Sequence, residues 1–489
     1  FATFDSVVIG TEAKAQSARS IAMGYKSTTN AAPPGISSAA AIAIGEEAST
    51  DNRSSENTNN LTKNQYNREA IAIGSKTKAF GDQSVAIGND VKASGNSSVA
   101  IGGDDIDKVR DANGNLYQNI TGQAMPSGWL STESAGDASV AVGVMASSQG
   151  HFSTAIGMTS SSSGDGAVAI GPTAKSSGES GVAIGIASQA TGKQSISVGK
   201  GNIVSGNNSA AIGDSSNISG NNSYSLGNNN TIATDNTFVV GSGVTVNTAA
   251  NTVNGNVILG NLSADKAYIQ VSDGTINGKT YNYAGKAAGV VSVGAIGAER
   301  QIVNVAPGAI TETSTDAING SQLYATNAVV GQVADDAAKA LGTTINPATG
   351  GINAPTYITN NPVTGAPTTS NNVGDAIKNL NAAVNSPLTF TDATTGSSTN
   401  PLGSTFKIEG DQNITTVVSQ GQAKIQLNPD LTGMNSITLG NTILNQGGLT
   451  VGGPTGPSIT TNGINAGDKK ITNVADGDVS TTSKDAING

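Results

Sequence analysis

The chain has no cysteine and only one histidine, His151, in 489 residues. Without cysteine there can be no disulfide framework, no thiol catalysis and no sulfur-ligated zinc, and a single histidine cannot build the usual zinc sites. A Ser/His/Asp nucleophile set would need that histidine in a pocket, and a chain rich in glycine and serine offers no evident one. We therefore expect no enzyme, no metal and no cofactor, and we place His151 at a corner of a repeat.

Large and charged side chains are also scarce. Aromatic residues make up 3% and charged residues 12% of the chain, whereas glycine alone accounts for 63 residues. Such a chain lacks the bulk that fills a wide core, yet its regular β-branched runs are not typical of disorder. A narrow solenoid, with a core one or two small side chains wide, satisfies both observations.

The charge balance narrows the range of partners. The formal net charge is −10, and the lysines are scattered without forming a basic stripe. Nucleic acid is therefore not expected as a partner, and anionic membrane surfaces are disfavoured. The chain has no initiator methionine, signal peptide or apolar run of transmembrane length. We interpret it as a fragment whose targeting signals lie elsewhere.

What the sequence does contain is a repeat of fourteen residues. Between residues 139 and 241, apolar runs such as SVAVG and AVAIG each close on a glycine. These closing glycines are Gly143, Gly157, Gly171, Gly185, Gly199, Gly213, Gly227 and Gly241. The same runs close earlier on Gly10, Gly24, Gly45, Gly74, Gly88 and Gly102, and the interval exceeds fourteen residues only before Gly45, before Gly74 and between Gly102 and Gly143. The period predicts fourteen stacked rungs over residues 1–241, with insertions at about 25–40, 46–69 and 103–138.

Each rung is apolar on both faces. In one rung Val99 and Ile101 point one way and Ala100 the other, because strand side chains alternate. A strand apolar on both faces is buried on both. We expect one face to fill the roll's own core and the small alanine face to be covered by neighbouring chains in a cyclic homo-oligomer. A weaker strand such as residues 91–95 completes the rung, with glycine and asparagine at the corners.

The repeat is lost after Gly241. Residues 242–299 still contain strand and turn patterns, at 255–260 and 267–285. Apolar and small residues then recur at heptad spacing and predict a short coiled coil over 325–342. The residues of this seam are Leu323, Thr326, Val330, Val333, Ala337 and Ala340.

A linker rich in Pro, Thr, Asn and Gly follows over 343–371. A helix opening at Asn372 and stopped by Pro387 begins a small α+β domain over 372–463. The strands expected in that domain are residues 405–410, 423–427 and 436–440.

One segment occurs twice, at 300–324 and again at 464–489, with a constant offset of 169 residues. Its polar residues are Asp316, Asn319, Ser321, Gln322 and Tyr324, with Asp485 and Asn488 in the second copy. They could form a ligand site. Their recurrence before a heptad favours a structural junction, in which they hydrogen-bond across subunits.

The third insertion holds a cluster of side chains that are rare elsewhere. It contains Tyr117, Leu130 and the sole tryptophan, Trp129. One interpretation is a protruding hairpin that contacts a partner. The interpretation that we favour is that Trp129 and Leu130 fold back and seal the insertion against the roll. For the aspartates at 104, 105 and 107 we favour a solvated turn over a calcium site, and for Gly114 a turn over a phosphate loop.

These motifs resemble a known family. The SVAIG rungs are similar to the YadA-like head of trimeric autotransporter adhesins, and RQIVNVAPGAITETSTDAINGSQLYAT (300–326) resembles the family's neck. Residues 464–489 resemble a second, truncated neck, and about 372–463 a stalk connector. The resemblance implies a left-handed parallel β-roll head, a homotrimer and a coiled-coil stalk, with type V secretion to a Gram-negative outer membrane. The anchor domain of such a protein would lie beyond Gly489.

The function that this resemblance implies is adhesion and virulence. The expected targets are extracellular matrix, host cells, abiotic surfaces or other copies of the protein, with autoagglutination and biofilm formation as consequences. Two alternatives remain at this stage: a trimeric phage or secreted fibre without an anchor, and a β-helix enzyme. The second would need a carboxylate or histidine constellation facing a groove, and none is evident.

Overall fold

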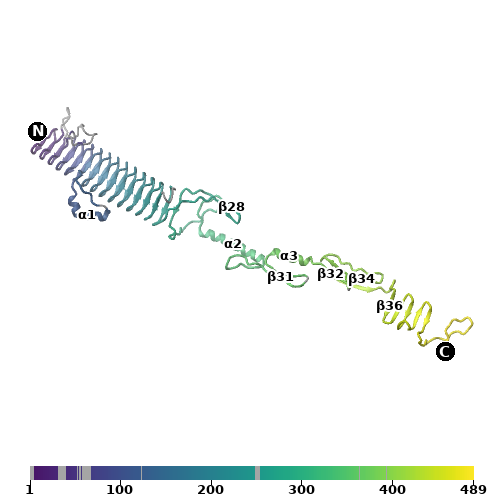
Figure 1. The fold of residues 1–489 in the computed structure, drawn as a ribbon. Helices are drawn as coiled ribbons and strands as arrows, with labels where there is room; N and C mark the ends of the chain where they lie inside the picture. The colour runs from purple at the N-terminus through teal and green to yellow at the C-terminus, as the bar shows by residue number, and fades with distance from the viewer. Residues whose placement is uncertain are drawn as a thin grey trace. The chain divides into compact units, whose positions relative to one another are not determined.

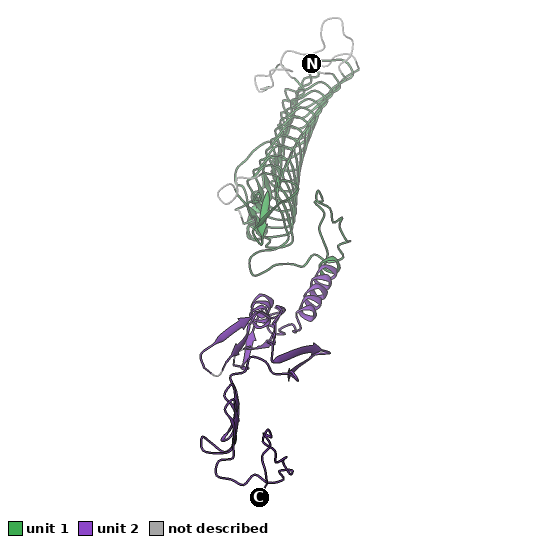
Figure 2. Cartoon of the chain, turned by 90° about the vertical axis from the view of Figure 1, so that its right-hand side faces the viewer, with its two compact units in different colours: residues 1–324 green, residues 325–489 purple. Residues whose placement is uncertain are grey.

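The fourteen-residue period forms a parallel β-roll in which each repeat is one turn of the coil (Figure 1). The computed structural model describes residues 5–30, 40–51, 53, 57, 68–122, 124–247, 254–362, 364–392 and 394–488. It divides into two units, residues 1–324 and 325–489, and the roll belongs to the first (Figure 2). The expected mainly β solenoid is confirmed.

The longer strand of every turn joins a sixteen-stranded sheet. Each strand pairs in parallel with the strand one turn later, as in Val168↔Val182, so identical repeat positions stack in columns. The strands in sheet order are β1 Val7–Ile9, β2 Ile21–Met23, β3 Ile42–Ile44, β4 Ile71–Ile73, β6 Val85–Gly88, β8 Val99–Gly102, β10 Val140–Val142, β12 Thr154–Ile156, β14 Val168–Ile170, β16 Val182–Ile184, β18 Ile196–Val198, β20 Ala210–Ile212, β22 Tyr224–Leu226, β24 Phe238–Val240, β26 Val257–Leu259 and β29 Val291–Ser292.

The weaker strand of the turn forms a second parallel sheet of eleven two-residue strands. These are β5 Lys78–Ala79, β7 Lys92–Ala93, β9 Glu133–Ser134, β11 Ser147–Ser148, β13 Ser161–Ser162, β15 Lys175–Ser176, β17 Gln189–Ala190, β19 Ile203–Val204, β21 Asn217–Ile218, β23 Thr231–Ile232 and β25 Thr245–Val246. One residue of each pair points inward and is buried, and the other lies half-exposed or exposed, as the alternating polar pattern predicts.

The insertions leave the register of the roll intact. Val99 of β8 pairs with Val140 of β10 across the third insertion, and β2, β3 and β4 pair in the same way across the first two. Residues 31–39 of the first insertion and residues 52, 54–56 and 58–67 of the second lie outside the described residues. The insertions therefore lie between successive turns without shifting the pairing of the strands.

The structure reverses the expected roles of the two strand faces. The central alanine, such as Ala100 or Ala169, is fully buried inside the roll, whereas its neighbours Val99 and Ile101 face outward and stay half-exposed or exposed. In this part of the roll the inward residues of the opposite strands, such as Ala93, Ser134 and Ser148, are small too, so the core here is narrow. Our assignment of the alanine face to the assembly surface was wrong. The valine and isoleucine face is the one left uncovered.

The core widens toward the last turns. There the inward positions change from alanine and serine to valine and isoleucine, which form one apolar cluster. Its members are Val204, Ala211, Ile218, Ile232, Val239, Val244, Val246 and Ile258.

The sheet continues beyond Gly241. Val257 of β26 pairs with Phe238 of β24, and Val291 of β29 pairs with Val257. Between them lies an antiparallel hairpin of β27 Asp273–Ile276 and β28 Lys279–Asn282, which is largely exposed. The expected coiled-coil segment is a helix, α2 Gly320–Ala340.

The second unit, as far as the structure describes it, contains most of α2, a shorter helix and a series of hairpins. Helix α3, Val373–Val384, begins at Asn372, whose side chain accepts a hydrogen bond from the backbone N–H of Asp375. Residues 405–410 were expected to form a strand and do not. Instead, Phe406 stacks on Phe390 with ring centroids 4.0 Å apart.

The strands of this unit all pair antiparallel with their sequence neighbours. They are β30 Tyr357–Asn360, β31 Pro367–Ser370, β32 Leu388–Thr391, β33 Ser397–Asn400, β34 Ile414–Ser419, β35 Gln422–Leu427, β36 Ser436–Leu439, β37 Thr442–Asn445, β38 Gly448–Thr450, β39 Ser458–Thr460 and β40 Gly463–Asn465.

Candidate functional site

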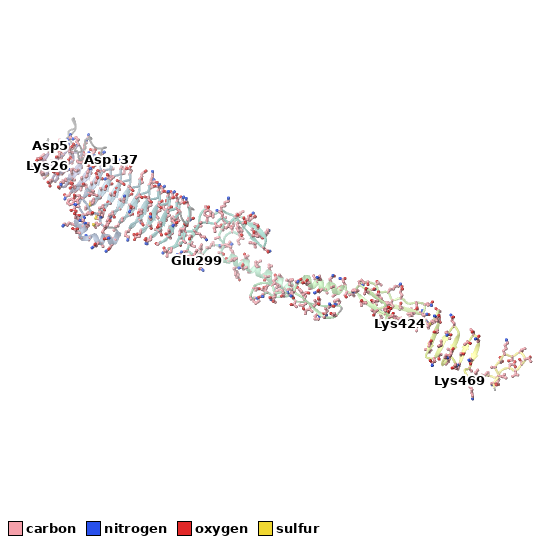
Figure 3. The ribbon with its side chains drawn as sticks, in the orientation of Figure 1. Asp5, Lys26, Asp137, Glu299, Lys424 and Lys469 are labelled. Carbon is pink, nitrogen blue, oxygen red and sulfur yellow. The ribbon has the colours of Figure 1, made fainter. Side chains whose placement is uncertain are left out.

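His151 lies at a corner of the roll, as expected, within a ladder of side-chain hydrogen bonds. The backbone N–H of Asp137, labelled in Figure 3, donates to His151 Nδ1 over 3.2 Å, and the N–H of His151 donates to Asp165 Oδ1 over 2.9 Å. Asn207 and Asn221 continue the same ladder further along the roll. Each side chain satisfies a backbone donor one turn earlier, so these polar residues hold the coil together.

The third insertion contains a helix, α1 Asp107–Thr121, which lies alongside the roll (Figure 1). Tyr117 attaches it: the ring is 8% exposed, and its hydroxyl hydrogen-bonds Thr173 Oγ1 over 2.9 Å. Ile106, just before the helix, is fully buried. Of the three candidate contact residues, Tyr117 is therefore used within the chain.

Trp129 and Leu130 behave differently from our favoured interpretation. Their side chains are 70% and 65% exposed, so they do not seal the insertion against the roll. The protruding-hairpin alternative is also wrong in form, because the insertion is helical. Both residues nevertheless present apolar surface to solvent, and they are available to a partner.

The aspartates at the start of the insertion form a helix entry. Asp105 accepts the N–H of Asp107 over 2.6 Å, and Asp107 pairs with Arg110 at 2.6 Å. Within the described part of the chain, no group of three or more acidic, histidine or cysteine side chains could hold a metal ion. Gly114, expected in a turn, lies inside α1 instead.

The described groups with resolved pKa shifts are separate surface residues. A hydrogen bond with the Tyr25 side chain raises the pKa of Lys26, and the Gly297 N–H, 3.0 Å from Glu299 Oε1, lowers the pKa of that carboxyl. Figure 3 labels both, in different parts of the first unit. The third, Asp392, has its pKa lowered mainly by the backbone N–H of Gly396 and lies in the second unit. They do not combine into an acid–base pair.

The neck is joined by hydrogen bonds within the chain, and the bonds that we expect across subunits stay a prediction. The Gln322 Oε1 accepts the N–H groups of Gly308 and Asn319 at 3.1 Å each, and its Nε2 donates to the Gly308 carbonyl over 2.7 Å. Asn319 Nδ2 donates to the Val305 carbonyl over 3.0 Å. Tyr324, the other predicted junction residue, is 74% exposed.

The second copy of the neck repeats these contacts. Asp316 accepts the N–H of Ala309 in the first copy, and Asp485 accepts the N–H of Asp478 in the second. Asn488 likewise donates to the Val474 carbonyl, matching Asn319. In both copies the aspartate and the asparagine therefore bind the loop backbone at equivalent positions.

Several apolar surfaces of the described residues are exposed within their own unit. On α2, Leu323, Val330 and Val333 are exposed along one seam, and α3 shows a similar stripe. Five in-register residues also cross the five-stranded sheet of the second unit on one face. These are Ile437, Leu444, Leu449, Ile459 and Ile464.

Among the described residues, no helix combines the length and apolarity needed to span a membrane. One exposed aromatic residue was missed from the sequence: Phe152, at a roll corner, is 72% exposed. The sequence could have revealed it, because the equivalent corner positions of the other turns hold small or polar residues.

Comparison with known families finds matches to the roll and to the two necks. The YadA head domain repeat matches residues 4–27, 67–90, 134–160, 162–188 and 190–216. The coiled stalk of trimeric autotransporter adhesins matches residues 301–346 and 470–489. The roll and the necks thus define a repeat protein built of head and stalk modules.

Two curated relatives carry these modules. Autotransporter adhesin BtaE of Brucella suis biovar 1 (strain 1330) is 33% identical over 221 residues, which cover 45% of this chain and 22% of BtaE. Trimeric autotransporter adhesin AtaA of Acinetobacter sp. (strain Tol 5) is 37% identical over 180 residues, 36% of this chain and 5% of AtaA. The chain therefore carries head and stalk modules like those of trimeric autotransporter adhesins, and it spans only a minor part of the length of these relatives.

Two solved structures are also similar in part. The C-terminal YadA-like domain of a Burkholderia pseudomallei protein is 31% identical, with 31% of this chain and 62% of that chain covered and a TM-score of 0.21. N-terminal domain 1 of VompD from Bartonella quintana is 28% identical, with coverage of 21% and 90% and a TM-score of 0.18. Scores this low add nothing to the description of the fold.

Proposed function

We propose that the chain is part of a homotrimeric adhesin on the surface of a Gram-negative bacterium. The observation that carries the trimer is the uncovered valine and isoleucine face of the roll. It repeats in every turn, and residues such as Ile184, Ile196 and Ile212 are 37–49% exposed. An apolar strip that runs along so many turns is a contact surface rather than a solvated one.

A cyclic assembly covers all copies of that strip at once. Around a threefold axis each copy presents the same face to the other two, so no copy is left with an exposed strip. The α2 seam has heptad spacing and is suited to a three-stranded coiled coil. The apolar row across β36–β40 needs the same kind of cover.

Adhesion follows from repetition along the trimer. Three copies of each outward surface raise avidity without a strong single site. The fold is a solenoid and both relatives are adhesins, which favours a binding and structural protein over an enzyme. The proposed targets are extracellular matrix, host cells, abiotic surfaces and other copies of the protein, with autoagglutination and biofilm formation as consequences. The alternative of a phage fibre gains no support from these relatives.

The proposed contact residues are Trp129 and Leu130. Binding of the 489-residue chain to collagen, laminin, fibronectin and bare plastic is compared with that of a Trp129→Ala/Leu130→Ala variant. We expect the variant to lose at least half of its bound fraction on one of these surfaces. Leu262→Ala is the matched control, since Leu262 is 71% exposed but lies outside the insertion. Equal binding of all three proteins would contradict a role for Trp129 and Leu130.

A further inference from the structure

The groove between α1 and the roll is open and apolar. Val109, Leu116 and Ile120 form its helix side, each 38–57% exposed. Met158, Pro172 and Ile186 form its floor on successive turns of the roll, and the hollow between the two sides has a volume of about 230 Å³. Tyr117 fixes the helix beside the groove without filling it.

The floor of the groove is specific to these turns. Its residues directly follow the closing glycine of their turns, as does Val144 one turn earlier. In most other turns this position is polar or glycine, as with Asn89, Lys200 and Asp214. The corner therefore becomes apolar where α1 lies against it.

Phe152 is unusual at the opposite corner of the same turn. It stands two residues before β12, at a position where the described turns otherwise carry small or polar residues such as Ser97, Ser180 and Asn208. Its φ is +62°, a conformation that bulky side chains rarely adopt. Phe152 is 72% exposed, and the centroid of its ring lies 6.4 Å from the centroid of the His151 ring.

Phe152 and the groove flank one strand. Phe152 lies two residues before β12 begins and Met158 two residues after it ends. Rotation about an axis parallel to the roll keeps each residue at its own level. With the valine and isoleucine faces turned to that axis, the end of β12 in one copy meets the start of β12 in the next.

We propose that the α1 groove binds Phe152 of the neighbouring copy. The site is complete only in the trimer, because the groove and the ring come from different chains, and three such contacts close the ring of subunits. This inference rests on the proposed homotrimer. It explains why an exposed phenylalanine is placed in a left-handed corner and why the facing corner has become apolar.

Disulfide trapping tests the contact directly, because the chain has no native cysteine. Under mild oxidation, the 489-residue Leu116→Cys/Phe152→Cys double variant is expected to run mainly as a covalent trimer on a non-reducing denaturing gel. A Leu116→Cys/Asn208→Cys variant is the matched control, since Asn208 occupies the same corner four turns later, and it should stay largely monomeric. A particle that light scattering shows to be trimeric, but that yields no covalent trimer from the first variant, would overturn the docking alone. A monomeric particle would overturn the proposed trimer itself.

Phe152→Asn supplies a second test with opposite outcomes. Asparagine tolerates the left-handed conformation, so in the absence of docking this change should raise the melting temperature. If Phe152 fills the neighbour's groove, the melting temperature of the trimer falls by several degrees. An unchanged or higher value would overturn the proposal.

Discussion

Each closing glycine of the roll lies where a side chain would meet the next turn. At Gly143, φ is +131° and a Cβ would approach the Gly157 carbonyl oxygen to 2.5 Å. Both the backbone conformation and the contact exclude larger residues. Close backbone packing between turns therefore requires glycine at this position of every repeat.

Gly143→Ala should therefore destabilise the roll strongly. Backbone strain and overpacking each cost about 1–3 kcal/mol, so we expect a loss of about 2–6 kcal/mol in the free energy of unfolding, measured by heat or denaturant. Gly114→Ala is the matched control, because a Cβ there meets only the Arg110 side chain at 3.7 Å. In the interior of α1 that change should stabilise by about 0.5–1 kcal/mol. A similar effect of the two changes would contradict the packing described here.

Asp392 makes a pH-dependent contribution to its turn. Its carboxylate accepts the backbone N–H groups of Gly396, Thr394 and Thr395, which lower its pKa. Because the folded pKa lies below the unfolded one, the turn is stabilised at neutral pH, and the contribution is lost as the pH falls through the folded pKa. Carboxyl NMR titration should show a low pKa for Asp392, shifted upward in Thr394→Val. An ordinary pKa in the parent chain would refute this.

At the scale of elements, the neck depends on one glutamine. Gln322→Ala removes three hydrogen bonds between the loop and the start of α2. We expect a loss of about 1–3 kcal/mol locally and faster hydrogen exchange at the Gly308 and Asn319 amides. Gln332→Ala on the same helix, where the side chain only reaches Asp336, should leave both amides unchanged. Unaltered exchange in Gln322→Ala would mean that the glutamine does not hold the neck.

The period predicts the elements of the roll but not which face of a strand is inward. Val99, Ala100 and Ile101 are all apolar, so alternation alone leaves two solutions. Side-chain size decides between them. Around Ala100 the facing strands contribute small residues such as Ala93 and Ser134, so the narrow core takes Ala100 and leaves Ile101 outside.

Helix α1 was missed because its sequence is rich in asparagine and contains Gly114, residues that favour turns. The signal that could have revealed it is the spacing of Val109, Leu116, Tyr117 and Ile120, which lie on one helical face. The recurrence of the neck residues favours a structural junction, which stays a prediction. Their partners within the chain depend on how the loop folds back, which the spacing alone does not determine.

At the scale of the whole molecule, both units leave apolar rows uncovered: the outward face of the roll, the α2 seam and the sheet of β36–β40. A single chain that exposed all of them would aggregate or bind its own copies. A threefold assembly covers them by the same symmetry in each module. We therefore expect the chain to be a trimer in solution.

Light scattering of the purified chain measures the absolute mass of the particle, and this mass gives the number of copies directly. One chain has a mass of 48.3 kDa, so we expect a trimer of about 145 kDa, three times that value. The mass should stay constant on dilution, and Ile184→Asp, on the outward face, should lower it. If the unsubstituted chain is a soluble, folded particle of 48.3 kDa, the proposed trimer is wrong.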